Sequence, residues 1–178
     1  MKVRILTMLA FGMALIASGA QAQQAAPGGK PAEAVPAKLP FDIPYGAPIS
    51  LERARHVIAA AEAEARKRKW AMNCAVLDSG ANLVSFDRMD GAQLGSIAIA
   101  EHKARAAVKF RRPTAAIEDG LQKHGAYYLM TLDDMIASRG GVPLVEGGKL
   151  IGAIGCSGGI GPQDELVATA GADVVNKK

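Results

Sequence analysis

Two adjacent glycines, Gly147 and Gly148, stand between the apolar runs 142–146 and 149–156. A two-residue hairpin turn needs positive φ at both central positions, which glycine adopts without steric cost. A second pair of strand-like segments, 72–78 and 82–89, is joined by the turn sequence Asp-Ser-Gly-Ala. Because strands joined as hairpins run antiparallel, these two pairs predict an antiparallel sheet.

Helical patterns surround the two hairpins. Apolar residues recur every three or four positions after Ser50, which is a suitable N-cap, and Pro113 permits a new helix to start behind it. Helices are expected over 50–69, 94–109, 114–123 and 162–175. The order helix, hairpin, helix, helix, hairpin, helix predicts an α+β fold, with the helices packed mainly on one face of the sheet.

The N-terminus has the pattern of a secretory signal peptide. Lys2 and Arg4 precede an apolar run over 6–17, and Ala20-Gln21-Ala22 offers a cleavage site between small residues. The apolar run is too short to span a bilayer as a relaxed helix. We therefore expect residues 1–22 to be removed on export, which places the mature protein in the periplasm or outside the cell.

A proline-rich segment follows the predicted signal peptide. Residues 23–48 contain six of the nine prolines among alanines and glycines, which predicts an extended tether whose last part, 41–45, packs on the domain surface. Residues 49–178 then form one domain, for which no stable membrane insertion is expected. Removing residues 1–22 lowers the formal net charge from +4 to +2, and aromatic residues are few, so nucleic acid is not an expected partner.

The two cysteines, Cys74 and Cys156, lie on different predicted strands. An oxidising compartment permits a disulfide between them. Sequence alone does not supply the Cα separation that decides whether two cysteines can bond. Two buried free thiols are the simpler expectation, and a disulfide is the alternative.

Arg88, its neighbour Asp90 and Lys103 are candidate ligand contacts. Arg88 ends the second predicted strand, on the face that alternation assigns to Val84 and Phe86, where its guanidinium either pairs with Asp90 or binds a ligand carboxylate. Lys103 lies on the apolar stripe of the second predicted helix. Such a lysine either extends its ammonium to solvent or lines a cavity with a lowered pKa.

Glycines recur every third residue in the last predicted strand and just beyond it, at Gly152, Gly155 and Gly158. Glycine within a strand marks the close approach of another backbone or of a flat ligand, so tight packing of a helix and a ligand contact are both open. Residues 155–159 also match the G-x-S-x-G pattern of serine hydrolases. The expected helix does not follow the serine at once, and all three histidines lie upstream, so we reject that function.

His102 and His124 are the candidate metal ligands. Neither has a second histidine or acid at the spacing of a helical metal site. Solvent exposure explains His102 equally well, and a position at the C-terminal end of a helix explains His124.

Taken together, these segments resemble the GlcG/HbpS family, which is itself similar to the C-terminal domain of PduO-type cobalamin adenosyltransferases. The segments that carry the resemblance are 76–80, 86–92, 103–107, 138–143, 148–158 and 163–165. It spans about residues 49–176. The resemblance implies a profilin-like sheet of about five strands flanked by helices, homo-oligomers up to octamers, and binding of haem, with a corrinoid as the less favoured cofactor.

The leading hypothesis is an exported oligomeric protein that binds haem or a related tetrapyrrole in an apolar pocket between the second helix and the glycine-rich hairpin. Arg88, Lys103 and Arg139 would receive acidic groups of this small-molecule ligand. Asp164 and Glu165 would cap the last helix or bridge subunits. One alternative is an enzyme of small 2-hydroxy or keto acids with Lys103 as the base, and another is a structural oligomer without a ligand.

Overall fold

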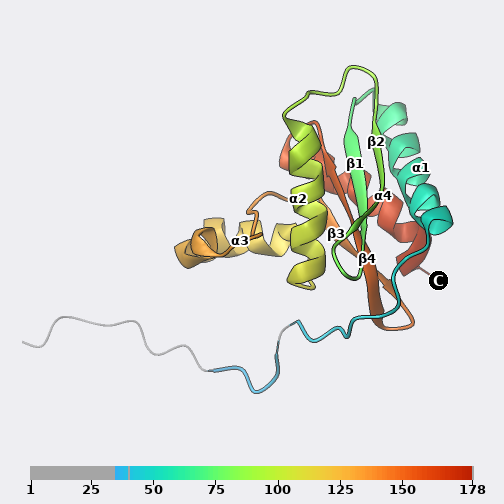
Figure 1. Ribbon diagram of the computed structural model, residues 1–178. Coiled ribbons are helices and arrows are strands. Elements are labelled where there is room, and N and C mark those ends of the chain that lie inside the picture. The colour runs from blue at the N-terminus through green and yellow to red at the C-terminus, as the bar shows by residue number, and fades with distance from the viewer. Residues whose placement is uncertain (1–34, 40, 178) are drawn as a thin grey trace, which may run out of the picture. The chain divides into compact units, whose positions relative to one another are not determined.

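The computed structural model describes residues 35–39 and 41–177, so the predicted signal peptide and half of the predicted tether lie outside the described residues. The observed fold is α+β, as the sequence predicts (Figure 1). Its elements are α1 (Leu51–Arg68), β1 (Asn73–Asp78), β2 (Leu83–Arg88), α2 (Ser96–Lys109), α3 (Thr114–His124), the 3₁₀ helix η1 (Tyr127–Thr131), β3 (Gly141–Glu146), β4 (Lys149–Ser157) and α4 (Gly161–Asn176). Every predicted helix and strand is present, with ends within about two residues, and η1 is the element that the sequence pattern did not predict.

The described strands form a four-stranded antiparallel sheet in the order β2-β1-β4-β3. Gly147 and Gly148 join β3 to β4 with φ values of 55° and 74°, which confirms the glycine hairpin. β1 and β4 are the two central strands, and they come from different hairpins. The sheet is therefore held together by long-range pairing as well as by its two turns.

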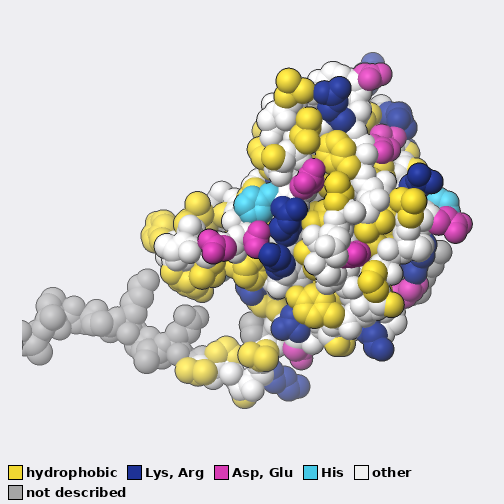
Figure 2. Space-filling model, viewed as in Figure 1, with side chains coloured by type: hydrophobic (Ala, Val, Ile, Leu, Met, Phe, Trp, Pro, Cys, Tyr) yellow, Lys and Arg dark blue, Asp and Glu magenta, His cyan; other side chains and the backbone are white. Residues whose placement is uncertain are grey.

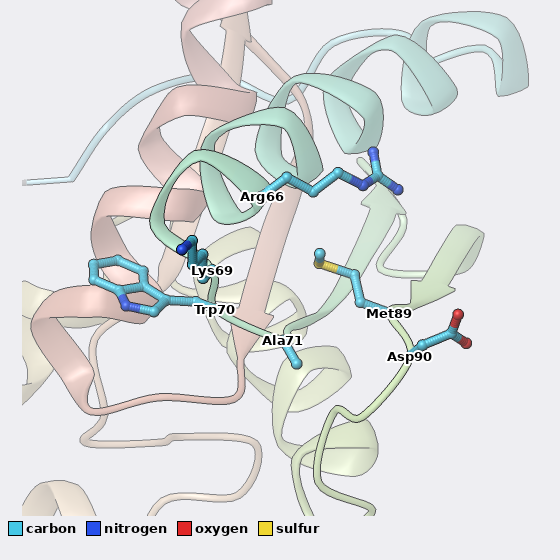
Figure 3. Close-up of a pocket in the computed structure, with 6 residues that line it drawn as sticks. All are labelled: Arg66, Lys69, Trp70, Ala71, Met89 and Asp90. Atoms are coloured by element: carbon cyan, nitrogen blue, oxygen red, sulfur yellow. The ribbon is translucent and has the colours of Figure 1, made fainter.

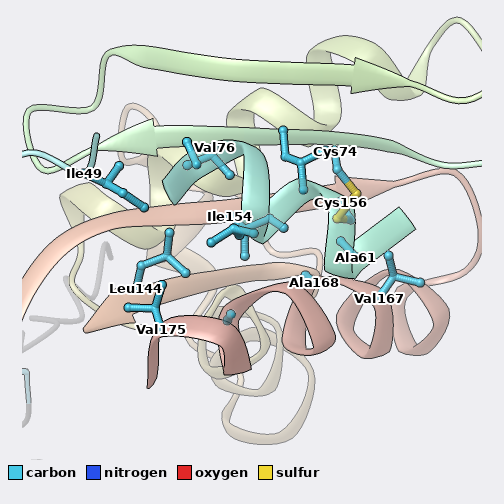
Figure 4. Packing of buried hydrophobic residues seen from close by; sticks show 14 of the residues in the cluster. Ile49, Ala61, Cys74, Val76, Leu144, Ile154, Cys156, Val167, Ala168 and Val175 are labelled. Carbon is cyan, nitrogen blue, oxygen red and sulfur yellow. A yellow bond between two sulfur atoms is a disulfide. The ribbon is translucent and has the colours of Figure 1, made fainter. Parts of the chain in front are cut away.

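Helices cover both faces of the sheet, so the expectation of helices mainly on one face is wrong. α1 and α4 pack with the side chains of Cys74, Val76 and Ile154 in the larger core cluster (Figure 4). α2 packs on the opposite face, against Ala75 and Ala153. The reason is that β1 and β4 are buried along almost their whole length, and strands that are apolar on both faces need a cover on each side.

The cysteines form a disulfide, so the expectation of two free thiols is also wrong. The register of β1 and β4 places Cys74 directly opposite Cys156, with Cα atoms 4.2 Å apart. Both residues are at most 2% exposed, within the core between the sheet and the helix pair α1–α4 (Figure 4). The bond joins the two hairpins across a sequence separation of 82 residues.

The end of the tether packs on the domain, as the sequence predicts for residues 41–45. Gly46 donates a backbone hydrogen bond to the Leu150 carbonyl, and Leu150 donates one to the Pro44 carbonyl, each 2.8 Å long. The Tyr45 hydroxyl donates to the carbonyls of Val108 and Lys109 at 3.1 Å each. Tyr45 thereby ties the end of the tether to carbonyl groups in the last turn of α2.

α3 and η1 form a small arm beside α2, defined here as residues 114–137. The arm encloses a cluster of its own in which Ile117 and Leu129 pack with Ala106 of α2. Tyr127, Tyr128 and Met130 are each at least 66% exposed. Figure 2 shows apolar side chains on the outer part of this arm.

None of the described helices combines the length and the apolar character that crossing a membrane requires.

Candidate functional site

Lys103 neither reaches solvent nor faces a ligand pocket, which corrects both expectations. It is 1% exposed, and its Nζ lies 2.7 Å from the Asp164 carboxylate and 3.4 Å from the Cys156 carbonyl oxygen, to both of which it donates. A buried ammonium requires such partners because removing it from water is costly. The hypothesis of an enzyme with Lys103 as its base therefore loses the residue on which it depends.

Asp164 organises the turn between β4 and α4. Its second carboxylate oxygen accepts hydrogen bonds from the backbone N–H groups of Gly158 and Gly159, at 3.1 and 2.9 Å. The carboxylate thus neutralises Lys103 and satisfies two amides ahead of the helix. This is close to the helix-start role that the sequence predicts for Asp164.

Arg139 lies at the centre of an ion-pair network within the chain, with its side chain 22% exposed. Its guanidinium bonds to Glu118 at 2.8 Å and to Asp119 and Glu165 at 3.1 Å each. The hydrogen bond to Glu118, reinforced by the negative charges of Glu118, Glu165 and Asp119, raises the pKa of Arg139. Arg139 therefore ties α3 to the start of α4.

Gly152 and Gly155 serve packing and leave no space for a flat ligand. A Cβ at Gly155 would lie 2.2 Å from the Ala100 carbonyl oxygen of α2, and one at Gly152 would lie 2.3 Å from the Leu77 carbonyl oxygen. Separations below 3.0 Å are not found between real atoms of this kind. The predicted pocket between α2 and the glycine-rich hairpin is thus filled by the helix backbone.

Arg88 and Asp90 do not form the expected ion pair. A register shift opposite Val76 and Leu77 breaks the alternation of β2, so Val84 packs with the α1–α4 side while Phe86 packs with the α2 side. Arg88 is exposed and forms no ion pair within the described part of the chain. It pairs in register with Asn73, and it does not line the hollow that holds Asp90.

The candidate metal ligands His102 and His124 lie apart from each other. His124 ends α3 and is exposed, whereas the Nε2 atom of His102 on α2 is buried without a hydrogen-bond partner. Among the described residues, no group of three or more histidine, cysteine, aspartate or glutamate side chains could hold a metal ion.

The candidate functional site is an open hollow of about 340 Å³ between the end of α1 and the end of β2 (Figure 3). The residues that line it are Arg66, Lys69, Trp70, Ala71, Met89 and Asp90. Arg66 lies above Met89, and the Met89 side chain points toward it, in Figure 3. Asp90 is the one residue of this lining that the sequence analysis had named as a ligand contact.

Two local features of the chain open this hollow. α1 ends because Lys69 adopts the left-handed conformation (φ 59°), with its N–H directed at the carbonyls of Ala65 and Arg66. On the opposite side, the Met89 N–H donates to the Met72 carbonyl at 3.0 Å, and Gly91 then turns the chain at a φ of 80°. The residues next to these two turns, Trp70 and Ala71 on one side and Met89 and Asp90 on the other, line the hollow.

The hollow is lined by charged side chains of both signs, Arg66, Lys69 and Asp90, and by apolar ones. Arg66 is paired with Glu62 at 2.8 Å, whereas the Lys69 ammonium forms no ion pair with any residue that the structure describes. Trp70 and Met89 are partly buried against the main core cluster. The Trp70 ring points away from Met89 and Asp90 in Figure 3, and the Arg68 guanidinium lies 5.2 Å from its centroid, so Met89 and Ala71 provide the apolar part of the hollow.

A second hollow of about 510 Å³ lies between α1 and α4 and has the opposite character. Its lining includes three carboxylates, Glu64, Glu165 and Asp173, against one cation, Arg68. This negative lining disfavours an acidic ligand. The hollow at the end of α1 is therefore the better site for one.

Sequence reasoning missed Arg66, Lys69, Trp70 and Met89 as site residues. The available signal was a cluster of cations beside the only tryptophan, at the end of a predicted helix. Cations in the last turn also stabilise a helix through its dipole, so the same pattern has an ordinary structural explanation. Only the fold brings this segment next to Met89 and Asp90.

The fold and the hollow define the class of the protein: a single-sheet α+β domain with helices on both faces and an open hollow at the end of α1. More specifically, the chain belongs to the haem-degrading HbpS-like family, whose model matches residues 49–173. It is 38% identical to Protein GlcG of Escherichia coli K12 over 109 residues, which cover 61% of this chain and 81% of GlcG. It is 35% identical over 130 residues to an uncharacterised 15.0 kDa protein of Citrobacter freundii, with 71% and 92% covered.

Solved structures of this family have the same fold. A double mutant of Streptomyces reticuli HbpS matches with a TM-score of 0.68 and 31% identity, over 82% of this chain and 99% of that one. A PduOC:heme complex matches with a TM-score of 0.66 and 25% identity, over 72% and 96%. The resemblance to the GlcG/HbpS family and to the PduO C-terminal domain is thereby confirmed.

Proposed function

We propose that this protein is an exported, self-associating binding protein for haem or a related tetrapyrrole. The observation that carries the proposal is the hollow at the end of α1, with apolar side chains and two cations in its lining. Membership of a family described as haem-degrading, and the haem complex of the PduO relative, support the same ligand class.

The residues of the hollow suit the chemistry of a tetrapyrrole. Its ring is flat and apolar, and Ala71 and Met89 provide apolar surface. Its two propionates need cationic partners, and Lys69 and Arg66 stand at the rim. Haem, when bound, supplies an iron centre for ligation or redox chemistry.

The size of the hollow and the exposed arm support self-association. A volume of about 340 Å³ is at the lower end of the range of small-molecule pockets, so a tetrapyrrole would extend over the surrounding surface. A second copy would cover that part. The exposed side chains of Tyr127, Tyr128 and Met130 provide apolar surface of the kind found in interfaces.

Export is supported by two independent features. The sequence of residues 1–22 has the organisation of a signal peptide. The Cys74–Cys156 disulfide fits an oxidising compartment such as the periplasm.

A hemin titration of the mature protein tests the proposal, with native mass measured before and after addition. We expect a shifted Soret band at saturation and a mass above that of a dimer. Lys69→Gln should weaken hemin binding by roughly tenfold or more, because a charge-assisted hydrogen bond contributes about 1.5–3 kcal/mol.

Lys149→Gln is the matched control, since Lys149 is exposed at the β3–β4 hairpin and does not line the hollow. It should bind hemin like the parent. A parent protein without a Soret shift would refute haem binding and favour a ligand-free oligomer. Equal affinity of the parent and the Lys69→Gln variant would place the ligand elsewhere.

A further inference from the structure

Two arginines, Arg111 and Arg112, are adjacent in the turn that joins α2 to α3, and both are half-buried. Neither guanidinium lies within ion-pair distance of a carboxylate in the part of the chain that the structure describes. Arg112 donates from Nε to the Phe110 carbonyl at 3.1 Å, and Arg111 donates from Nη1 to the Ile43 carbonyl at 3.2 Å. Because a guanidinium has five N–H donors, each one retains donors for which no described residue provides an acceptor.

Aromatic rings of the tether hold the two guanidinium groups in place. The guanidinium carbon of Arg112 lies 3.7 Å from the centroid of the Phe41 ring, and that of Arg111 lies 5.7 Å from the centroid of the Tyr45 ring. Both rings belong to the segment that passes the end of α2 (Figure 1). Stacking uses the flat face of a guanidinium and leaves the N–H groups at its edge free to donate.

The two positive charges are held at an electrostatic cost. Burial lowers the pKa of Arg112, and the positive charge of Arg111 lowers it further, against an opposing effect of the Tyr128 phenol. Arg111 also adopts the left-handed conformation (φ 50°), for which the end of a helix usually has glycine. Adjacent like charges without a counter-charge, one of them partly desolvated, favour the binding of an anion.

We propose that Arg111 and Arg112 form a binding site for an oxyanion, the carboxylate or phosphate group of a small ligand. The fork of donors on a guanidinium matches the oxygen atoms of both groups. Neither arginine lines the hollow at the end of α1, so this site is separate from the one proposed for haem. A bound anion should also stabilise the packed tether, because it fixes the guanidinium groups on which Phe41 and Tyr45 stack.

Titrations of the mature protein with malonate and with inorganic phosphate, at an ionic strength held constant with chloride, test the site. We expect saturable shifts of the NMR signals of Arg111 and Arg112, and the probe that binds more tightly identifies the preferred oxyanion. Arg112→Gln should weaken binding by about tenfold or more, because it removes a charge-assisted hydrogen bond. Arg55→Gln, at an exposed position on α1, is the matched control and should bind like the parent.

Phe41→Leu separates an anion site from a simple clamp on the tether. It removes the ring on which Arg112 stacks but keeps both charges, so it should weaken anion binding less than Arg112→Gln does. Bound anion should also slow hydrogen exchange of the Gly46 amide in the parent, since that amide holds the tether to the Leu150 carbonyl at 2.8 Å.

Two results would overturn the site: a parent that binds neither probe saturably, and equal affinity of the parent and the Arg112→Gln variant. The two arginines would then serve only to hold the tether. Neither result bears on haem binding, which the hemin titration tests separately.

Discussion

At the scale of single residues, the buried Lys103–Asp164 pair explains why a lysine stands on an apolar helix stripe. The two side chains are 1% and 3% exposed and lie 2.7 Å apart. Asp164 keeps two further hydrogen bonds, from Gly158 and Gly159, whereas the other contact of Lys103 is a single long one to the Cys156 carbonyl. Without Lys103, the Asp164 carboxylate would therefore keep two hydrogen bonds, whereas without Asp164 the Lys103 ammonium would keep only one long one.

We expect Asp164→Ala to destabilise the domain by about 3–5 kcal/mol, because it leaves a buried ammonium without its counter-charge. Lys103→Met should cost clearly less, since Asp164 retains its two backbone donors and methionine fills the space of the lysine stem. Urea unfolding of both variants and the parent, with the disulfide intact, measures the difference. Equal stability of Asp164→Ala and the parent would contradict the buried pair.

At the scale of elements, the packing of α2 on β4 depends on the absence of a side chain at Gly155. The helix backbone approaches so closely that a Cβ would overlap the Ala100 carbonyl oxygen and the Ala104 nitrogen. Small residues on α2, including Ala100, Ala104 and Ala107, allow the same approach from the other side. α2 and β4 can therefore pack closely because both have small residues at their contact.

Gly155→Ala should therefore destabilise the domain by about 1–3 kcal/mol or more, because the backbone of α2 must shift to admit the methyl group. Gly95→Ala is the matched control: nothing lies within 4 Å of its Cβ position, and its φ of −60° suits any residue. That variant should be neutral or more stable by about 0.4–1 kcal/mol. Thermal unfolding of the two variants compares them directly, and the same melting temperature for both would show that α2 can move freely.

At the scale of the whole molecule, long-range links beyond the core packing help to hold the domain together. The disulfide joins the two hairpins across the centre of the sheet. Tyr45 ties the end of the tether to the end of α2, and Arg139 ties the arm to α4. Each link connects segments that are distant in sequence.

Export and disulfide formation should be visible together in one intact-mass measurement. Protein recovered from the periplasm should begin at Gln23 and carry the mass of a disulfide. Its cysteines should react with an alkylating reagent only after unfolding and reduction, because both are at most 2% exposed. A full-length cytoplasmic product with reactive thiols would contradict the proposed compartment.

The sequence by itself determined the elements and the antiparallel hairpins, since hydrophobic periodicity, Gly147-Gly148 and the Ser50 cap act over a few neighbouring residues. The family resemblance followed from the same segments. What it could not determine was how the elements meet. The face covered by α2 and the Cys74–Cys156 bond depend on pairing between β1 and β4, which are more than 70 residues apart.

The candidate site was decided almost entirely by the tertiary structure. Four residues that are unusual in the sequence have contacts with other parts of the chain: Lys103, Arg139, Gly152 and Gly155. A pattern of residue types does not distinguish a contact within the chain from a contact with a ligand. The hollow arises only where the end of α1 and the end of β2 lie side by side. Local sequence fixes dihedral angles and helix ends, whereas the position of one chain segment against another is set by the packing of the whole core.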